Sequence, residues 1–257
     1  MQPHGVVMEG VVRDYLDMVV AAARDVVAGK LAATWAVGSL ATGELDLRCS
    51  DLDVIAVSAR PLDAGERTSL AHRLSHSRLE CPAHGLDFIL YAESELRSLR
   101  RTPCYEFSIS TGPDWQDDVG AGGLYAGGIL DLELARTRGV TLAGVTPGQV
   151  IAPVPMSWIR EEAVNSVRWH KTRIHDSFHD PFGTNAVLNA CRASRLLRTG
   201  ELVSKSEGAR WRLSQQPEEV VVAALQARGQ CGRERLDYAM VLGFVDKVLA
   251  EVAKDTI

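Results

Sequence analysis

The sequence lacks most of the features that mark secreted and membrane proteins. It has five cysteines in 257 residues, an odd number, and none of them forms a Cys-x-x-Cys pair. This argues against a disulfide framework and against a zinc site. No apolar run approaches the roughly 18 residues that cross a membrane, and the first residues show no charged-then-apolar signal segment. These absences predict a cytoplasmic protein with no membrane partner.

The sequence also has no excess of positive charge. It carries 28 Lys and Arg against 33 Asp and Glu, which gives a net charge of -5 at pH 7. Binding to nucleic acid needs basic groups that neutralise phosphates, so we expect no nucleic-acid partner. A small cationic substrate fits the acidic balance better. With 46% hydrophobic and 24% charged residues, the composition is that of an ordinary globular protein.

The first half of the sequence mixes strand and helix patterns. Apolar residues at helical spacing predict a helix over 6–27, and a second, more polar helix is expected over 66–77. Strands are expected over 31–37, 52–57, 86–91 and 104–110. The segment 112–128 is rich in Gly and Asp and is expected to form a linker or flap. This pattern predicts an α/β (α+β) domain with a mixed sheet over residues 1–150.

The second half has a different character. Three prolines between residues 144 and 155 interrupt the chain, and no convincing strand follows them. Helices are expected over 157–174, 185–198, 204–213, 217–226 and 234–252. We therefore predict an all-α helical bundle domain over residues 151–257.

One motif in the first half combines a turn with two carboxylates. Gly38-Ser39 is followed, after eleven residues, by Asp51-Leu52-Asp53 and then by an apolar strand. Side chains of a strand alternate, so Asp51 and Asp53 should share one face. Two adjacent carboxylates repel each other unless a cation lies between them, and magnesium prefers such oxygen ligands. Backbone N–H groups and the hydroxyl of a Gly-Ser turn suit a phosphate. The motif therefore predicts nucleotide chemistry.

Further candidate site residues lie on the later strands. Asp87 sits inside the apolar run 85–91, where an ionised group is costly unless it is paired or binds a metal. We expect it to be a base or ligand beside the first two aspartates, the alternative being a solvent-facing aspartate of an edge strand. Glu106 belongs to the polar face of the strand 104–110 and could line a site for a substrate with ammonium groups. Trp115 could supply an apolar platform for a ligand.

The helical half contributes candidates for which the sequence leaves alternatives open. Lys205 follows Ser204 in a capping-box pattern, so it lies in the first helical turn, where a cation opposes the helix dipole. It is either functional or a solvated surface lysine. Arg192 lies between apolar residues one turn away on either side, and either snorkels at a rim or reaches into a cleft. Asp180 lies in a histidine-containing loop that is either solvated or part of a substrate wall.

These motifs resemble a known family. Gly38-Ser39 with Asp51-Leu52-Asp53 matches the pattern of the DNA polymerase β-like nucleotidyltransferases. The chain is more closely similar to the aminoglycoside adenylyltransferases that modify streptomycin and spectinomycin. The segments 138–144, 185–200 and 205–211 resemble the connection between their domains and the paired helices of their C-terminal domain.

The resemblance implies roles for the residues of the motif. Asp51 and Asp53 hold two Mg2+ ions on the co-substrate ATP, and Asp87, a further metal ligand, takes the place of the catalytic base. Gly38 and Ser39 contact the triphosphate. The implied reaction transfers AMP to a hydroxyl group of an aminoglycoside or aminocyclitol and releases pyrophosphate. One departure is that the usual base of the family is glutamate.

The resemblance also extends to the helical half and to the acceptor. Arg192 and Lys205 reach the phosphates of an ATP held between the two domains, and Trp115 corresponds to a tryptophan that lines the antibiotic site. Members that act on streptomycin carry a tryptophan and an acidic residue where this chain has Arg173 and Phe178. A basic residue is a poor neighbour for a guanidinium-bearing drug, so spectinomycin is favoured over streptomycin.

Two alternatives to this function remain at the level of the sequence. The protein could be a nucleotidyltransferase that acts on another small molecule, on a protein or on an RNA end. It could also be a fold of this type that has lost catalysis and serves as an antitoxin or regulator. Three retained carboxylates argue against the second alternative. A monomer is expected, as is common in the family.

Overall fold

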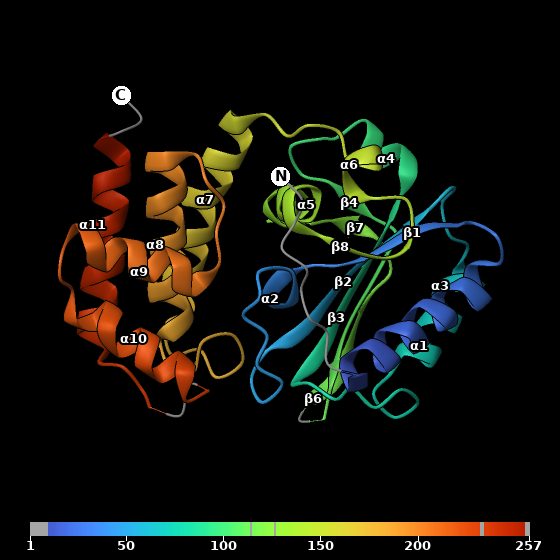
Figure 1. Cartoon of the computed structure of the whole chain (residues 1–257), viewed down its shortest axis with the longest axis horizontal. Coiled ribbons are helices and arrows are strands. Elements are labelled where there is room, and N and C mark those ends of the chain that lie inside the picture. Colours follow the sequence, from blue (N-terminus) through green and yellow to red (C-terminus); the bar gives the residue numbers. More distant parts are fainter. Residues whose placement is uncertain (1–9, 114, 126, 232–233, 255–257) are drawn as a thin grey trace. The chain divides into compact units, whose positions relative to one another are not determined.

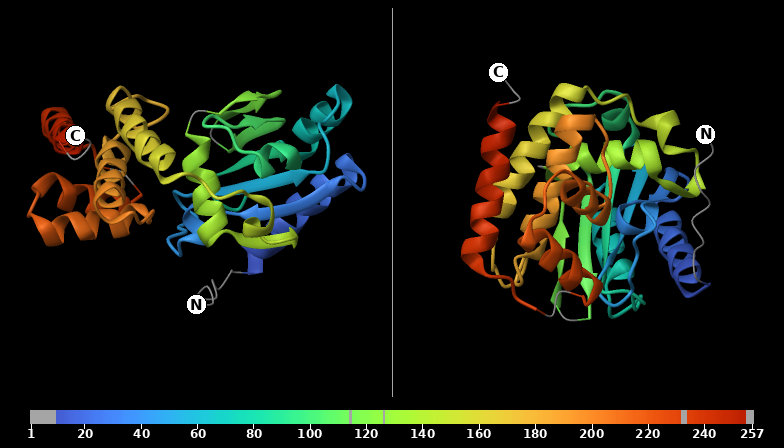
Figure 2. Two further views of the ribbon diagram at one scale, coloured as in Figure 1. Left: turned by 90° about the horizontal axis from the view of Figure 1, so that it is seen from above. Right: turned by 60° about the vertical axis from the view of Figure 1, so that its left-hand side comes forward.

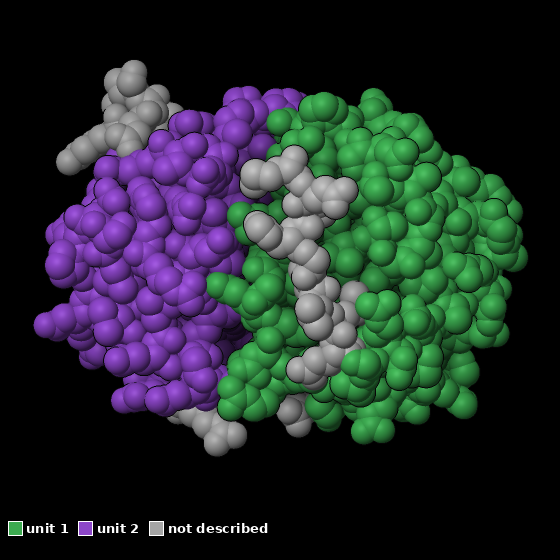
Figure 3. All heavy atoms as spheres, in the orientation of Figure 1, with its two compact units in different colours: residues 1–154 green, residues 155–257 purple. Residues whose placement is uncertain are grey.

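The structure is a computed structural model that describes residues 10–113, 115–125, 127–231 and 234–254. The chain divides into two compact units, Met1–Val154 and Pro155–Ile257. Figure 3 distinguishes them by colour. The sequence placed the division after residue 150. None of the helices in the described parts of the chain has the length and apolar content that a membrane crossing requires.

A mixed sheet with strand order β6-β5-β3-β2-β1-β8 forms the centre of the first unit. Its strands are β1 Leu31–Ala36, β2 Asp51–Ser58, β3 Gly85–Ala92, β5 Phe107–Gly112, β6 Trp115–Gly120 and β8 Val140–Gly144. Neighbours β2 and β3 run parallel, and the other four neighbouring pairs of this sheet are antiparallel. A small second sheet pairs β4 Cys104–Tyr105 with β7 Gly123–Leu124. The predicted mixed sheet is confirmed.

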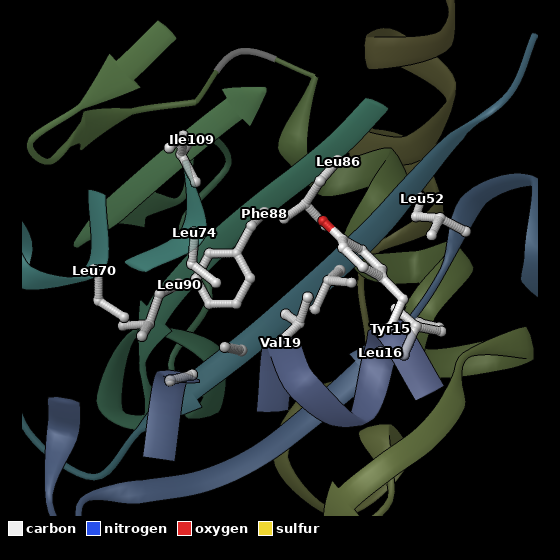
Figure 4. Packing of buried hydrophobic residues seen from close by; sticks show 14 of the residues in the cluster. Tyr15, Leu16, Val19, Leu52, Leu70, Leu74, Leu86, Phe88, Leu90 and Ile109 are labelled. Atoms are coloured by element: carbon white, nitrogen blue, oxygen red, sulfur yellow. The ribbon is translucent and has the colours of Figure 1, made fainter. Parts of the chain in front are cut away.

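Helices cover both faces of this sheet (Figures 1 and 2). On one face, α1 Gly10–Val27 and α3 Ala64–Leu74 pack their apolar side chains against the strands, as Figure 4 shows for Tyr15, Leu70 and Phe88. On the other face lie α4 Glu93–Arg97, α5 Gly128–Arg138 and α6 Pro147–Val150.

The alternation of side chains along β2 assigns its residues to these two faces. Leu52 and Val54 join the core under α1 and α3, whereas Ile55 joins the core under α5. Because successive side chains point to opposite faces, Asp51 and Asp53 lie on the α5 side of the sheet.

Three predictions for the first unit were wrong in detail. The expected linker over 112–128 contains β6, whose Asp and Gly residues suit an exposed strand at the edge of the main sheet, and β7 of the small second sheet. The single strand expected over 104–110 is divided at Glu106 into β4 and β5. The Gly-Ser turn is a one-turn helix, α2 Gly38–Ala41.

The second unit consists of helices in the parts that the structure describes. They are α7 Met156–Lys171, α8 Thr184–Thr199, α9 Lys205–Gln215, α10 Glu219–Gly229 and α11 Tyr238–Lys254. The central helix is α8 (Figure 1), which packs against the other four. Most of its residues are buried. The predicted helical character of this half is confirmed.

Candidate active site

Three aspartates stand on the α5 side of two adjacent parallel strands. Asp53 on β2 lies opposite Asp87 on β3 in the register of the sheet, and neighbouring strands are about 4.8 Å apart. Asp51 precedes Asp53 by two residues and shares its face. Both are half-buried, while Leu52 between them is buried. The structure therefore brings the three predicted carboxylates together.

The surroundings of Asp87 disfavour its charged form. Its pKa is raised to about 6, first by desolvation and then by the negative charges of Asp51 and Asp131. A hydrogen bond from Ser110, its neighbour on β5, and the charge of His84 act in the opposite direction. The side chain nevertheless keeps an opening to solvent. Asp87 is thus crowded by like charges but accessible, as a proton acceptor or a metal ligand must be.

His84 is a site residue that the sequence reasoning missed. Its Nδ1 lies 3.0 Å from Oδ1 of Asp51, and its backbone N–H donates to the carbonyl oxygen of Ser50. The register pairs Asp51 with Gly85, so the residue before β3 necessarily lies beside the start of β2. A prediction that these two strands are parallel would have found His84.

The α2 helix carries Gly38 and Ser39 and brings Gly38 against the carboxylate of Asp53. Gly38 has φ +57°, and a Cβ atom there would overlap the carboxylate of Asp53. The backbone N–H of Val37 donates to the carbonyl oxygen of Asp53 at 2.9 Å, which fixes this approach. Among the described residues, the buried Oγ of Ser39 has no hydrogen-bond partner. A buried hydroxyl without a partner is costly, and a phosphate oxygen would satisfy it.

The donor set of this face fits a divalent cation bound to a nucleotide. Aspartate oxygens are the ligands that Mg2+ prefers, and Mg2+ is held in proteins by a few carboxylates together with substrate phosphates. Asp51, Asp53 and Asp87 offer such oxygens on one face, and Ser39 offers a hydroxyl nearby. The residues present therefore fit the predicted metal and the predicted triphosphate.

Glu106 has a structural partner in place of the predicted substrate. Its carboxylate accepts hydrogen bonds from Arg67 at 2.8 Å and from the backbone N–H of Leu62 at 3.1 Å. These bonds tie the β4–β5 connection to the start of α3, so Glu106 is not available as the predicted substrate contact. Trp115 begins β6, where its backbone pairs with Gly112, and its role at the acceptor site stays a prediction.

In the helical unit, Arg192 and Lys205 belong to one polar cluster. Lys205 follows the predicted capping box, which is present, and its Nζ donates to Oδ1 of Asn185 at 2.8 Å. Arg192 donates to the carbonyl oxygen of Val203 and to Oδ1 of Asn189, at 3.0 and 3.2 Å. The side chains of Arg192 on α8 and Lys205 on α9 are thus each held by hydrogen bonds within the helical unit.

The close packing of α8 and α9 depends on Gly208. A Cβ atom there would lie 2.9 Å from the backbone of Arg192. His170 lies at the end of α7, near this cluster. Its pKa is lowered to about 3, first by desolvation and then by the charges of Lys205 and Arg192. His170 is therefore neutral, and the sequence did not predict its place there.

Asp180 has a different role from the predicted one. Its side chain is buried at 1% exposure, and its two oxygens accept hydrogen bonds from the backbone N–H groups of Asn185 and Ala186. The N-cap of α8 is Gly183, which offers no side-chain acceptor. Asp180 therefore caps α8 from within the loop, and the expected contact with a substrate is not supported.

Comparisons with known proteins agree with the resemblance seen in the sequence. Residues 149–251 match the family described as aminoglycoside adenylyltransferase, C-terminal domain. The fold is similar to that of spectinomycin adenyltransferase AAD(9) from Enterococcus faecialis, crystallised with ATP and spectinomycin. The TM-score is 0.74 at 17% sequence identity, over 93% of this chain and 98% of that chain. No curated protein sequence gives a match. The resemblance is thereby confirmed for the C-terminal part of the chain and for the fold.

Proposed function

Because residues 149–251 match the family model of the aminoglycoside adenylyltransferase C-terminal domain, we propose that this protein is an aminoglycoside O-adenylyltransferase. It would transfer AMP from Mg-ATP to a hydroxyl group of an aminoglycoside or aminocyclitol. The observation that carries the proposal is the register of Asp53 with Asp87, with Asp51 beside them, on the face that α2 approaches. A lone Asp-x-Asp pair would not suffice, but three carboxylates beside a hydroxyl without a partner fit this chemistry.

In the proposed reaction, the hydroxyl oxygen of the acceptor attacks the α-phosphorus of ATP. The bond from this phosphorus to the oxygen that bridges to the β-phosphate breaks, and pyrophosphate leaves. Asp87 accepts the proton of the attacking hydroxyl. Two magnesium ions, held by Asp51, Asp53 and Asp87, would offset the charge of the triphosphate and of the leaving pyrophosphate. Ser39 would donate its hydroxyl to a phosphate oxygen.

The helical unit would supply positive charge to the same nucleotide. Arg192 and Lys205 are held by side-chain and backbone acceptors on α8 and α9, so both are positioned before a ligand binds. We propose that Arg192 and Lys205 contact the phosphates of ATP, as the resemblance of this chain to the family implies.

Among acceptors, the proposal favours spectinomycin over streptomycin. The guanidinium of Arg173 lies over the ring of Trp169, 5.3 Å from its centroid, and Phe178 is exposed. Streptomycin carries guanidinium groups of its own, which a fixed positive charge in this loop would repel. The compound crystallised with AAD(9) is spectinomycin, which is consistent with this preference.

A pyrophosphate-release assay with Mg-ATP and a panel of aminoglycosides tests the proposal. We expect release with spectinomycin, little release with streptomycin, and an adenylylated product in mass spectrometry. ATP binding without release for any drug would overturn the antibiotic as acceptor and favour another small molecule, a protein or an RNA in its place. We also propose that the protein is cytoplasmic, which its five free cysteines fit. We further propose that it is a monomer, which light scattering can test.

A further inference from the structure

Helix α5 adds a fourth carboxylate to the face that bears the three aspartates. Leu132 and Ala135 of α5 pack into the core on this face, and α5 also contacts α2, which carries Ser39. Asp131 directly precedes Leu132 in the first turn of α5, and a Cβ atom on Gly128 of the same turn would lie 3.2 Å from the hydroxyl of Tyr91 on β3. Tyr91 belongs to the core on the α5 side of the sheet, so the first turn of α5 lies over the strand and the face that bear Asp87. The side chain of Asp131 is exposed.

Tyr125 forms a pair with Asp131. Its hydroxyl donates to Oδ2 of Asp131 at 3.2 Å, and its ring meets the ring of Tyr105 edge-on, with centroids 6.5 Å apart. A Cβ atom on Gly128 would lie 2.5 Å from the Tyr125 ring, so the absence of a side chain lets this ring pack on the first turn of α5. Tyr125 is still 37% exposed. The pair thus presents a fixed carboxylate beside a partly open aromatic ring.

We propose that Asp131 and Tyr125 bind an ammonium group of the acceptor, and so select acceptors that carry an amine near the reacting hydroxyl. Asp131 would supply the opposite charge, and the Tyr125 ring would contact the carbon atoms and the cation. This inference rests on the proposed function, in which the metal ions engage Asp51, Asp53 and Asp87.

The aromatic ring distinguishes an organic cation from a further metal ion. Mg2+ keeps several waters and demands oxygen ligands in an octahedron, and an aromatic face beside Asp131 offers it nothing. An alkylammonium group has both a charge for the carboxylate and an apolar surface for the ring. A neutral sugar has no charge for Asp131, so it should be a poor acceptor.

Isothermal titration with spectinomycin, in the presence of Mg2+ and a non-hydrolysable ATP analogue, tests this directly. For Asp131→Asn we expect Kd and the acceptor KM to rise about 10-fold or more, which corresponds to ~1.4 kcal/mol. kcat and the KM for ATP should change little. Asp131→Glu should recover part of the affinity. Asp14→Asn, which alters an exposed aspartate of α1, is the matched control and should change neither constant.

A second readout separates charge recognition from a general structural role. The wild-type affinity should fall as salt rises from about 50 mM to about 500 mM, and this dependence should be weaker in Asp131→Asn. Tyr125→Phe keeps the ring and should lose less affinity than Tyr125→Ala.

Unchanged spectinomycin affinity in Asp131→Asn would overturn the inference and leave the proposed function intact. Binding of spectinomycin without AMP transfer would overturn the proposed function alone, and no binding of any aminocyclitol would overturn both.

Discussion

The carboxylate of Asp53 occupies the space that a Cβ atom on Gly38 would need. The same glycine has φ +57°, which residues with a side chain rarely adopt. Two independent constraints therefore act at one position, one steric and one conformational. The steric constraint exists only because the strand β2 places the carboxylate of Asp53 against α2, so Gly38 couples the segment proposed to bind phosphate to the strand proposed to bind the metal.

Gly38→Ala is expected to reduce kcat/KM for AMP transfer by about 100-fold, because displacements near 1 Å at a reacting centre are costly. Gly43→Ala is the matched control. Gly43 has φ +73°, but a Cβ atom on it would meet nothing within 4 Å, so this variant should lose about 1 kcal/mol of stability and keep its activity. An equal loss of activity in both variants would show that backbone strain, and not the close approach to Asp53, causes the loss of activity in Gly38→Ala.

Asp87→Asn is expected to lower kcat for AMP transfer by about 10²–10⁴-fold, the contribution typical of a general base. The variant keeps the shape of the side chain and removes its ability to accept a proton.

Asp53→Asn should abolish turnover by weakening the metal site, and should therefore also weaken Mg2+-dependent binding of ATP. Turnover that persisted in Asp53→Asn at saturating Mg2+ would refute the metal assignment.

The sequence was sufficient for the central carboxylates, and the reason is geometric. Asp51 and Asp53 open a strand whose period of two fixes their shared face. Asp87 lies in an apolar run that predicts a strand, where an ionised group pointed to a partner or a metal, and the register of β3 with β2 places it opposite Asp53. The local pattern therefore predicted where these carboxylates lie, and their roles stay a prediction.

Residues that depend on tertiary contacts were missed or misassigned. His84, Asp131 and His170 have no local signal, because each reaches its neighbours from another element. Glu106 was expected to face a substrate, but its partner Arg67 is 39 residues away in the sequence. Asp180 looked like a loop aspartate because its capping bonds reach past the glycine that begins α8.

Lys205→Met is expected to raise the KM for ATP by about 10-fold, because a hydrogen-bonded charge on a phosphate contributes about 1.5–3 kcal/mol. The acceptor KM should change less. Lys171→Met removes another lysine of the helical unit, one that pairs with Asp246 at 2.5 Å, and should leave ATP binding unchanged. If both variants behaved alike, Lys205 would be one more surface lysine held by Asn185.

The ion pairs of Arg212 are expected to stabilise the helical unit. Arg212 is 4% exposed, and its guanidinium donates to Glu251 at 2.6 Å and to Glu218 at 3.0 Å. Removing one partner of a buried ion pair leaves charge uncompensated, so Arg212→Met should cost about 3 kcal/mol in urea unfolding. Arg73→Met breaks an exposed pair with Asp25 and should cost less than about 1 kcal/mol.

The hydrogen bond from Arg212 lowers the pKa of Glu251 below its ordinary value of 4.5. A carboxyl group whose pKa is lower in the folded state stabilises the fold above the unfolded pKa, and this contribution is lost as the pH falls. The wild type should therefore lose stability below about pH 4.5, and Glu251→Gln should flatten that dependence while keeping most of the packing. Urea midpoints measured between about pH 3 and pH 7 decide this, because parallel curves for the wild type and Glu251→Gln would exclude Glu251 as the titrating group.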